Sequence, residues 1–253
     1  MKNSNLKFLV SSSLVLLSLV IGGQVLAAED AKEMNQKGKV TVKSSATTEV
    51  VDPEKPEETE DPEEPGPSTK GDLRIDYVSP IDFGKVKLTD SNRKYTALAT
   101  KIGKNTLTRG NFIQISDYRE KSTGWSLQVK QETQFKTQNH DELTGAVLSL
   151  DKGWANSTST SGAPAVTRDT LAINNIGEAY DVARATPDSG SGVWSIIFGA
   201  SKDNDDNQQE TVSKGKGDSN IRNSAVSITI PDSTKVVPKE YQTKITWILA
   251  ETP

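Results

Sequence analysis

Short runs in which apolar and polar residues alternate recur along residues 71–253. The longest is 241–249, whose alternation places on one face Tyr241, Thr243, Ile245, Trp247 and Leu249. Residues 125–131 repeat the pattern, with Trp125 and Leu127 on a common face. A period of two is typical of half-buried β-strands, and β-branched and aromatic residues favour the same structure. Both runs are therefore predicted to be strands.

The same pattern, punctuated by clusters of Gly, Asn, Asp and Ser, predicts eight strands in this region. They lie at 73–78, 83–88, 112–116, 125–131, 146–150, 193–198, 226–230 and 241–249. The nearest approach to a helical period is 175–185, where Gly177 weakens the helix. Residues 201–220 are polar enough to form a long loop. The predicted fold class is mostly β, as one antiparallel β-sandwich-like domain at 71–253.

Residues 1–27 have the pattern of a signal peptide. Lys2 and Lys7 precede an apolar run at 8–21, and cleavage is predicted before Ala28. A retained membrane anchor is the alternative, but the apolar run is short for a span of about 20 residues. The mature chain is therefore expected to be secreted and to contain no membrane span.

Residues 28–70 lack the apolar side chains that a core needs. Between 49 and 64 there are nine acidic residues and one lysine, with three prolines among them. Mutual repulsion and proline stiffness keep such a segment extended. The prediction is a disordered, acidic, Pro-rich linker that acts as a spacer, and an acidic docking tail is the alternative.

Charge and residue usage argue against several function classes. Residues 71–253 carry 22 basic and 22 acidic side chains, so they have no electrostatic footprint for nucleic acid. The chain has no cysteine, which excludes disulfides and thiolate metal sites. Its one histidine, His140, lies in a polar run, and no serine has a Gly-x-Ser-x-Gly context. No catalytic residue and no cofactor are predicted, and a glycan-cleaving enzyme is the least favoured hypothesis.

A run of acids and amides at 203–207 invites comparison with a calcium loop. Asp203, Asp205 and Asn207 begin like an EF-hand. Gln208 then replaces the glycine of the tight turn, and Lys214 replaces the bidentate acid. The interpretation is a solvated loop, and no metal site is predicted.

The tryptophans allow two interpretations. Trp125 and Trp247 alternate in phase with apolar neighbours, as core residues do, and a buried tryptophan removes about 150–250 Å² from water. Alternatively, these two side chains line a groove where an indole stacks on a sugar ring. Trp154 and Trp194 have no clear face.

The motif Trp125-Ser126-Leu127 and the terminal Tyr241-x-x-x-Ile245-Thr246-Trp247-Ile248-Leu249 resemble the two signature motifs of the WxL domain. Further matches lie at Asp117 and Arg119, at Leu143-Thr144-Gly145-Ala146-x-Leu148, and at Asp82-Phe83-Gly84. The resemblance covers 71–253. It implies a cell-wall-binding module exported by low-GC Gram-positive bacteria.

The resemblance implies a secreted, non-catalytic module that attaches non-covalently to peptidoglycan or another wall polymer at the cell surface. The absence of a Leu-Pro-x-Thr-Gly sorting motif agrees with non-covalent attachment. The candidate wall-binding residues are Trp125, Leu127, Tyr241, Trp247 and Leu249. The alternative is a protein–protein adaptor that reaches the wall through a membrane-anchored partner, for example by pairing with an exposed edge strand.

Overall fold

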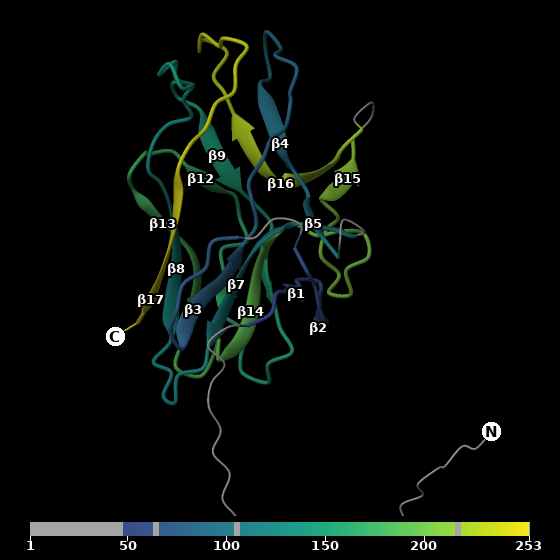
Figure 1. Cartoon of the computed structure of the whole chain (residues 1–253), viewed down its shortest axis with the longest axis vertical. Coiled ribbons are helices and arrows are strands. Elements are labelled where there is room, and N and C mark those ends of the chain that lie inside the picture. The colour runs from purple at the N-terminus through teal and green to yellow at the C-terminus, as the bar shows by residue number, and fades with distance from the viewer. Residues whose placement is uncertain (1–47, 63–65, 104–106, 216–218, 253) are drawn as a thin grey trace, which may run out of the picture. The chain divides into compact units, whose positions relative to one another are not determined.

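Antiparallel sheets make up the fold of the computed structural model, which describes residues 48–62, 66–103, 107–215 and 219–252 (Figure 1). These residues contain no helix. The predicted mostly-β fold class is confirmed. The predicted signal peptide at 1–27 and the first part of the predicted linker, 28–47, lie outside the described residues.

The central sheet has the strand order β10-β14-β7-β3. Its strands are β10 (Gly153–Asn156), β14 (Gly192–Phe198), β7 (Asn111–Asp117) and β3 (Leu73–Val78). All seven residues of β7 are buried. Ile113 and Ile115 belong to the main apolar core, whereas Phe112 belongs to a second cluster. The sheet is covered on both faces, which explains why its two middle strands do not follow a simple apolar–polar alternation.

The second sheet, here called the motif sheet, has the strand order β11-β13-β8-β17. It contains β11 (Ala165–Val166), β13 (Ala179–Ala185), β8 (Trp125–Gln131) and β17 (Ile245–Glu251). Burial alternates strictly along β8, so one face packs on the core and the other faces solvent. β17 is an edge strand of this sheet, at the left of the view in Figure 1.

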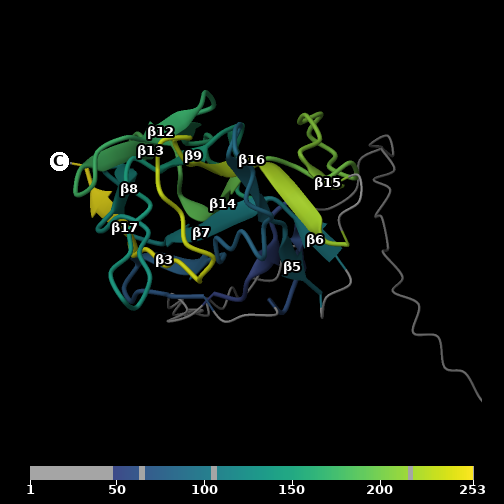
Figure 2. The ribbon, with the colours of Figure 1, turned by 90° about the horizontal axis from the view of Figure 1, so that it is seen from above.

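The third sheet is built around the long strand β16 (Ile221–Thr229). Its other strands are β12 (Leu171–Ile173), β9 (Val147–Leu150), β15 (Val212–Lys214) and β4 (Lys94–Leu98). The main core combines side chains of all three sheets, among them Ile115, Leu127 and Leu148. Seen from above, β17 and β16 lie on opposite sides of the fold (Figure 2).

Two hairpins complete the fold. One joins β5 (Thr100–Ile102) to β6 (Leu107–Arg109), and the other joins β1 (Val51–Asp52) to β2 (Lys55–Thr59). Val50 and Leu107 pack on the second apolar cluster, which contains Ile102 and Phe112. The segment that holds the β1–β2 hairpin therefore belongs to the folded body.

The prediction of a disordered linker over 28–70 is wrong for this hairpin. The Val51 N–H donates to Oε1 of Gln114 over 2.9 Å, and Gln114 donates back to the Glu49 carbonyl over 3.0 Å. Asp52 and Glu54 are buried as well. Composition failed as a guide because Asp52 is paired with Arg109 of β6 and Glu54 accepts hydrogen bonds from Ser201.

Most of the predicted strands are confirmed. Those at 73–78 and 125–131 have the observed bounds of β3 and β8, and those at 112–116, 146–150, 193–198 and 226–230 overlap β7, β9, β14 and β16.

The other sequence-based assignments differ from the structure. Residues 83–88 form no strand, because Phe83 packs edge-on against Phe135 while the residues after it are exposed. Residues 179–185, within the weak helical pattern, form β13. The predicted loop at 201–220 contains β15, with Thr211 and Val212 buried.

Candidate functional site

The two Trp-x-Leu motifs lie side by side in the motif sheet. Leu249 of β17 is paired with Leu127 of β8, and Trp247 is paired with Val129. Directly paired residues of antiparallel strands share a face. All four motif side chains therefore belong to the inward face of the sheet. Tyr241 lies four residues before β17, outside the strand that was predicted to contain it.

Trp125 is a core residue. Its side chain is 0% exposed, and its indole N–H donates to the Gly190 carbonyl over 3.1 Å. Gly190 has a φ of +74°, and a Cβ there would lie 2.7 Å from Nε1 of Trp125. The glycine is thus required for the close approach of the turn to the indole. Leu127 is equally buried, so neither residue can contact a polymer in this fold.

Trp247 differs from the other three tryptophans. Its ring packs at 6.4 Å from Phe198, yet the side chain is only half-buried. The indoles of Trp154 and Trp194 donate to the carbonyls of Gly199 and Ser191 at 2.9 and 3.0 Å. Within the described part of the chain, the Trp247 indole N–H makes no hydrogen bond.

The backbone of β17 has a free edge. β17 pairs with β8 on one side, and no described strand pairs with its other side. The Thr252 N–H donates to Gly124, and the Lys244 carbonyl accepts from Glu132. Because N–H and C=O groups alternate sides along a strand, the backbone groups of Trp247 and its odd-numbered neighbours point to the free edge.

An ion pair connects the last residues of β17 to the start of β8. Asp117 is buried, and its carboxylate accepts two hydrogen bonds from the Arg119 guanidinium, each 2.8 Å long. Arg119 also donates to the Gly124 carbonyl over 3.0 Å and lies 2.9 Å from the Glu251 carboxylate. Burial would raise the pKa of Asp117, but the hydrogen bonds from Arg119 and Ser122 outweigh burial and hold the pKa below its ordinary value.

A polar depression of about 700 Å³ lies where the chain enters β17. Residues 137–140 and, apart from Tyr241, the segment 239–244 line much of it. The Tyr241 hydroxyl holds the second of these segments, since it donates to the Val237 carbonyl and accepts from the Val237 N–H, both over 3.0 Å. His140 is exposed here with a φ of +66°. Tyr241 thus has a clear role in fixing this turn.

A family model for the WxL domain, described as surface cell wall-binding, matches residues 29–253. The chain belongs to the WxL domain family. The recognition from two motifs is confirmed, and the WxL assignment makes this a cell-surface protein associated with the wall. Searches of curated proteins and of solved structures gave no match. No helix of the described residues has the length and apolar character to span a membrane.

The remaining WxL matches have structural roles. Leu143 and Ala146 are buried in the main core, and Gly145 has a φ of +75° against Pro231. The Leu98 N–H donates a hydrogen bond of 2.7 Å to the backbone carbonyl of Asp82. These motifs therefore stabilise the WxL fold around the site.

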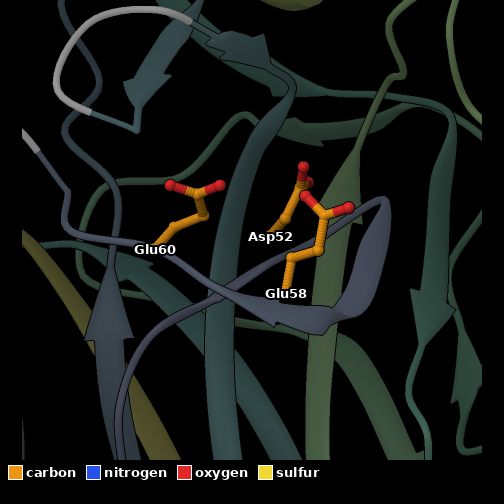
Figure 3. Close-up of side chains that lie close together, drawn as sticks. All are labelled: Asp52, Glu58 and Glu60. Atoms are coloured by element: carbon orange, nitrogen blue, oxygen red, sulfur yellow. The ribbon is translucent and has the colours of Figure 1, made fainter. Parts of the chain in front are cut away.

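Three carboxylates on the N-terminal segment lie together, those of Asp52, Glu58 and Glu60, with one oxygen of each within 4.8 Å of the others (Figure 3). Arg109 donates to both oxygens of Asp52, at 2.8 and 2.6 Å. The burial of Asp52 is therefore explained by its arginine. In the 203–207 run, the Asn204 side chain binds the backbone of Ser201 and Gln208 and so holds the loop itself.

Sequence reasoning missed two features of this WxL domain. The first is the Arg119–Glu251 pair, for which the signal was an arginine just before one motif and an acid just after the other. The second is the depression at residues 137–140 and 239–244, whose two turns are about 100 residues apart in the chain. Only the ladder between β8 and β17 brings them together.

Proposed function

We propose that this WxL domain attaches non-covalently to peptidoglycan through the β17 side of the motif sheet, without catalysis. Trp247 carries the proposal. Its half-buried ring is held against Phe198, and its indole N–H has no partner among the residues that the structure describes. An indole with one apolar face and one free donor suits a sugar ring with its hydroxyls. Because packing already fixes the ring, binding costs little side-chain entropy.

The other candidate residues divide into two roles. Trp125 and Leu127 stabilise β8, against which β17 is paired. Leu249 is half-buried on β17, next to Trp247 on the same face, and Tyr241 fixes the turn that leads into the strand. Contact with the polymer is therefore assigned to Trp247 and Leu249, with Tyr241 in support.

The test is binding of the purified full chain to washed, protein-free sacculi. Wild type should sediment with them, and Trp247→Phe, which keeps the packing on Phe198 but lacks the N–H, should bind several-fold more weakly. Tyr118→Ala is the matched control, because Tyr118 is an exposed aromatic residue outside this surface. If wild type does not sediment, or if Tyr118→Ala loses as much binding as Trp247→Phe, the proposal is wrong.

A protein–protein adaptor is the second candidate, and the free edge of β17 favours it. The backbone groups of Ile245, Trp247 and Leu249 could pair with a strand of a membrane-anchored partner. An adaptor of this kind would not bind protein-free sacculi. It would bind walls only after the partner is added, and the same sedimentation experiment separates the two.

A further inference from the structure

The polar depression beside β17, here called the turn depression, is a built site. Its first wall is the turn at 137–141, where the buried Thr137 hydroxyl accepts the N–H groups of Asn139 and Asp141 at 3.2 and 3.1 Å. Its second wall is the turn that the Tyr241 hydroxyl fixes. Both walls are held by hydrogen bonds before any ligand arrives, which lowers the cost of binding.

Lysines from both chain segments line the turn depression. Lys136 is paired with Gln242, and each backbone N–H donates to the other carbonyl over 2.9 Å. Alternate residues of an extended chain share a face, so Lys244 lies on the same face as Gln242. Lys239 lines the depression from the second turn. Three lysines therefore line the same depression of about 700 Å³.

Acids also lie around these lysines, and Glu142 is joined to Lys136 by a β-bridge. Lys239 lies 3.3 Å from Asp141, and Glu240 accepts a hydrogen bond from Gln242 over 2.6 Å. Glu132, on the strand beside Lys244, is paired with Lys130 at 3.0 Å. Among the described residues, no acid lies within ion-pair distance of Lys136 or Lys244. The charged side chains that line the turn depression are three lysines and one glutamate, so the lining keeps a net positive charge.

We propose that the turn depression binds a phosphate group of a polyol-phosphate or sugar-phosphate polymer of the wall, a site that rests on the wall attachment proposed above. Its cations are all lysines, compact point charges that suit phosphate, whereas planar carboxylate recognition favours arginine. Thr133, Gln138 and Asn139 supply hydroxyl and amide groups for the hydroxyls of such a polymer. The depression lies just before the start of β17, beside the turn that Tyr241 fixes.

The test uses the full chain and two wall preparations, intact walls and walls stripped of phosphate polymers by hydrofluoric acid, both free of protein. The variant is Lys136→Gln with Lys244→Gln. The control is Lys85→Gln with Lys87→Gln, which removes the same charge from two exposed lysines elsewhere. On intact walls the variant should bind on the order of tenfold more weakly than the control, since charge-assisted hydrogen bonds are lost. On stripped walls the variant and the control should bind equally.

The outcomes separate this site from the wall attachment itself. Equal binding of variant and control to intact walls overturns the phosphate site. The site is also overturned if the variant loses the same binding on both wall preparations, because carboxylates of the wall would then be the ligand. Binding of wild type to stripped walls supports the peptidoglycan proposal independently of the lysines. Wild type that binds neither preparation overturns both proposals.

Discussion

The two ends of the folded body are built in opposite ways. The N-terminal segment, 48–60, is acidic and nearly without apolar side chains, yet Asp52 and Glu54 are only 0% and 2% exposed. The C-terminal segment, 241–251, is rich in aromatic and aliphatic residues, yet every residue of β17 is half-buried or exposed. Burial is therefore the reverse of what side-chain polarity favours.

The difference follows from what each segment packs against. The N-terminal segment covers a face of the central sheet that carries Arg74, Gln114 and Ser116, so its polar groups find partners and stay satisfied. β17 closes the motif sheet at an edge, where half of its backbone groups have no strand beside them. The first arrangement stabilises the fold, whereas the second leaves groups available for binding.

The largest effect is expected from Asp52→Ala. This change leaves the Arg109 guanidinium buried without its bidentate partner and with Glu54 3.6 Å away. Breaking a buried ion pair from one side typically costs about 3–5 kcal/mol. Denaturant unfolding at neutral pH measures the loss of unfolding free energy.

Asp61→Ala is the control for this change, because Asp61 is an exposed acid just after the hairpin. Its unfolding free energy should stay within about 0.5 kcal/mol of wild type. A loss of less than about 1 kcal/mol for Asp52→Ala would mean that the N-terminal segment is only loosely attached.

A smaller effect is expected from Trp247→Ala. The side chain is half-buried at an edge, so its truncation should cost about 2 kcal/mol, whereas Trp125→Ala should cost about 3–5 kcal/mol. Trp247→Ala should therefore fold and still lose binding to sacculi. Melts and sedimentation on the same preparation measure both properties. If Trp247→Ala loses as much unfolding free energy as Trp125→Ala, Trp247 is as much a core residue as Trp125.

The fold class and the motif strands could be predicted because alternation of apolar and polar residues depends only on the local geometry of a strand. The strict pattern of Trp125-Ser126-Leu127 marks a strand with one buried face, and β8 has the predicted bounds. The pattern of 241–249 gave the face of Trp247 and Leu249 correctly. It could not tell a central strand from an edge strand, because that depends on which strands lie beside it.

The N-terminal hairpin could not be predicted for a related reason. An acidic, proline-rich stretch has no local signal of burial, and its partners are distant in the chain, among them Arg109, 57 residues from Asp52. Composition also does not show that the lysines of the turn depression lie close together in the fold. Lys136 and Lys244 come together only through the β8–β17 ladder. Long-range pairing of polar residues is the part that a single sequence does not reveal.

The pH dependence should have opposite signs at Glu54 in the N-terminal segment and at Asp117, whose partner Arg119 also pairs with Glu251 of β17. Burial raises the pKa of Glu54 above its ordinary 4.5, although hydrogen bonds from Ser201 and the charge of Arg109 oppose the shift. The stability that this group contributes is full below pH 4.5 and is lost as the pH rises through the raised pKa. For Asp117 the pKa is lowered, so its contribution is full above pH 3.8 and is lost as the pH falls through the lowered pKa.

Glu54→Gln tests the N-terminal half of this contrast. The variant keeps the shape of the side chain and cannot ionise. Its melting temperature relative to wild type should therefore rise as the pH increases from about 4 towards neutral. Melting curves over this range measure the difference. A constant difference would show that the Glu54 carboxyl titrates as it does in the unfolded chain.

The smallest effect is expected at the other end, from Glu251→Gln. The Glu251 carboxylate lies 2.9 Å from the Arg119 guanidinium, but the acid side chain is 57% exposed. Exposed ion pairs contribute about 0–1 kcal/mol, and salt screens them, so the loss should be below about 1 kcal/mol and should vanish near 1 M salt. Arg119 keeps its bonds to the buried Asp117 in either case, so the start of β8 should stay in place.

Unfolding at low and high ionic strength measures the loss of unfolding free energy for Glu251→Gln. Glu240→Gln is the control, because Glu240 is another exposed acid near β17. A salt-independent loss above about 2 kcal/mol would show that the C-terminal strand is held as firmly as the N-terminal hairpin, and the contrast between the two ends would fail.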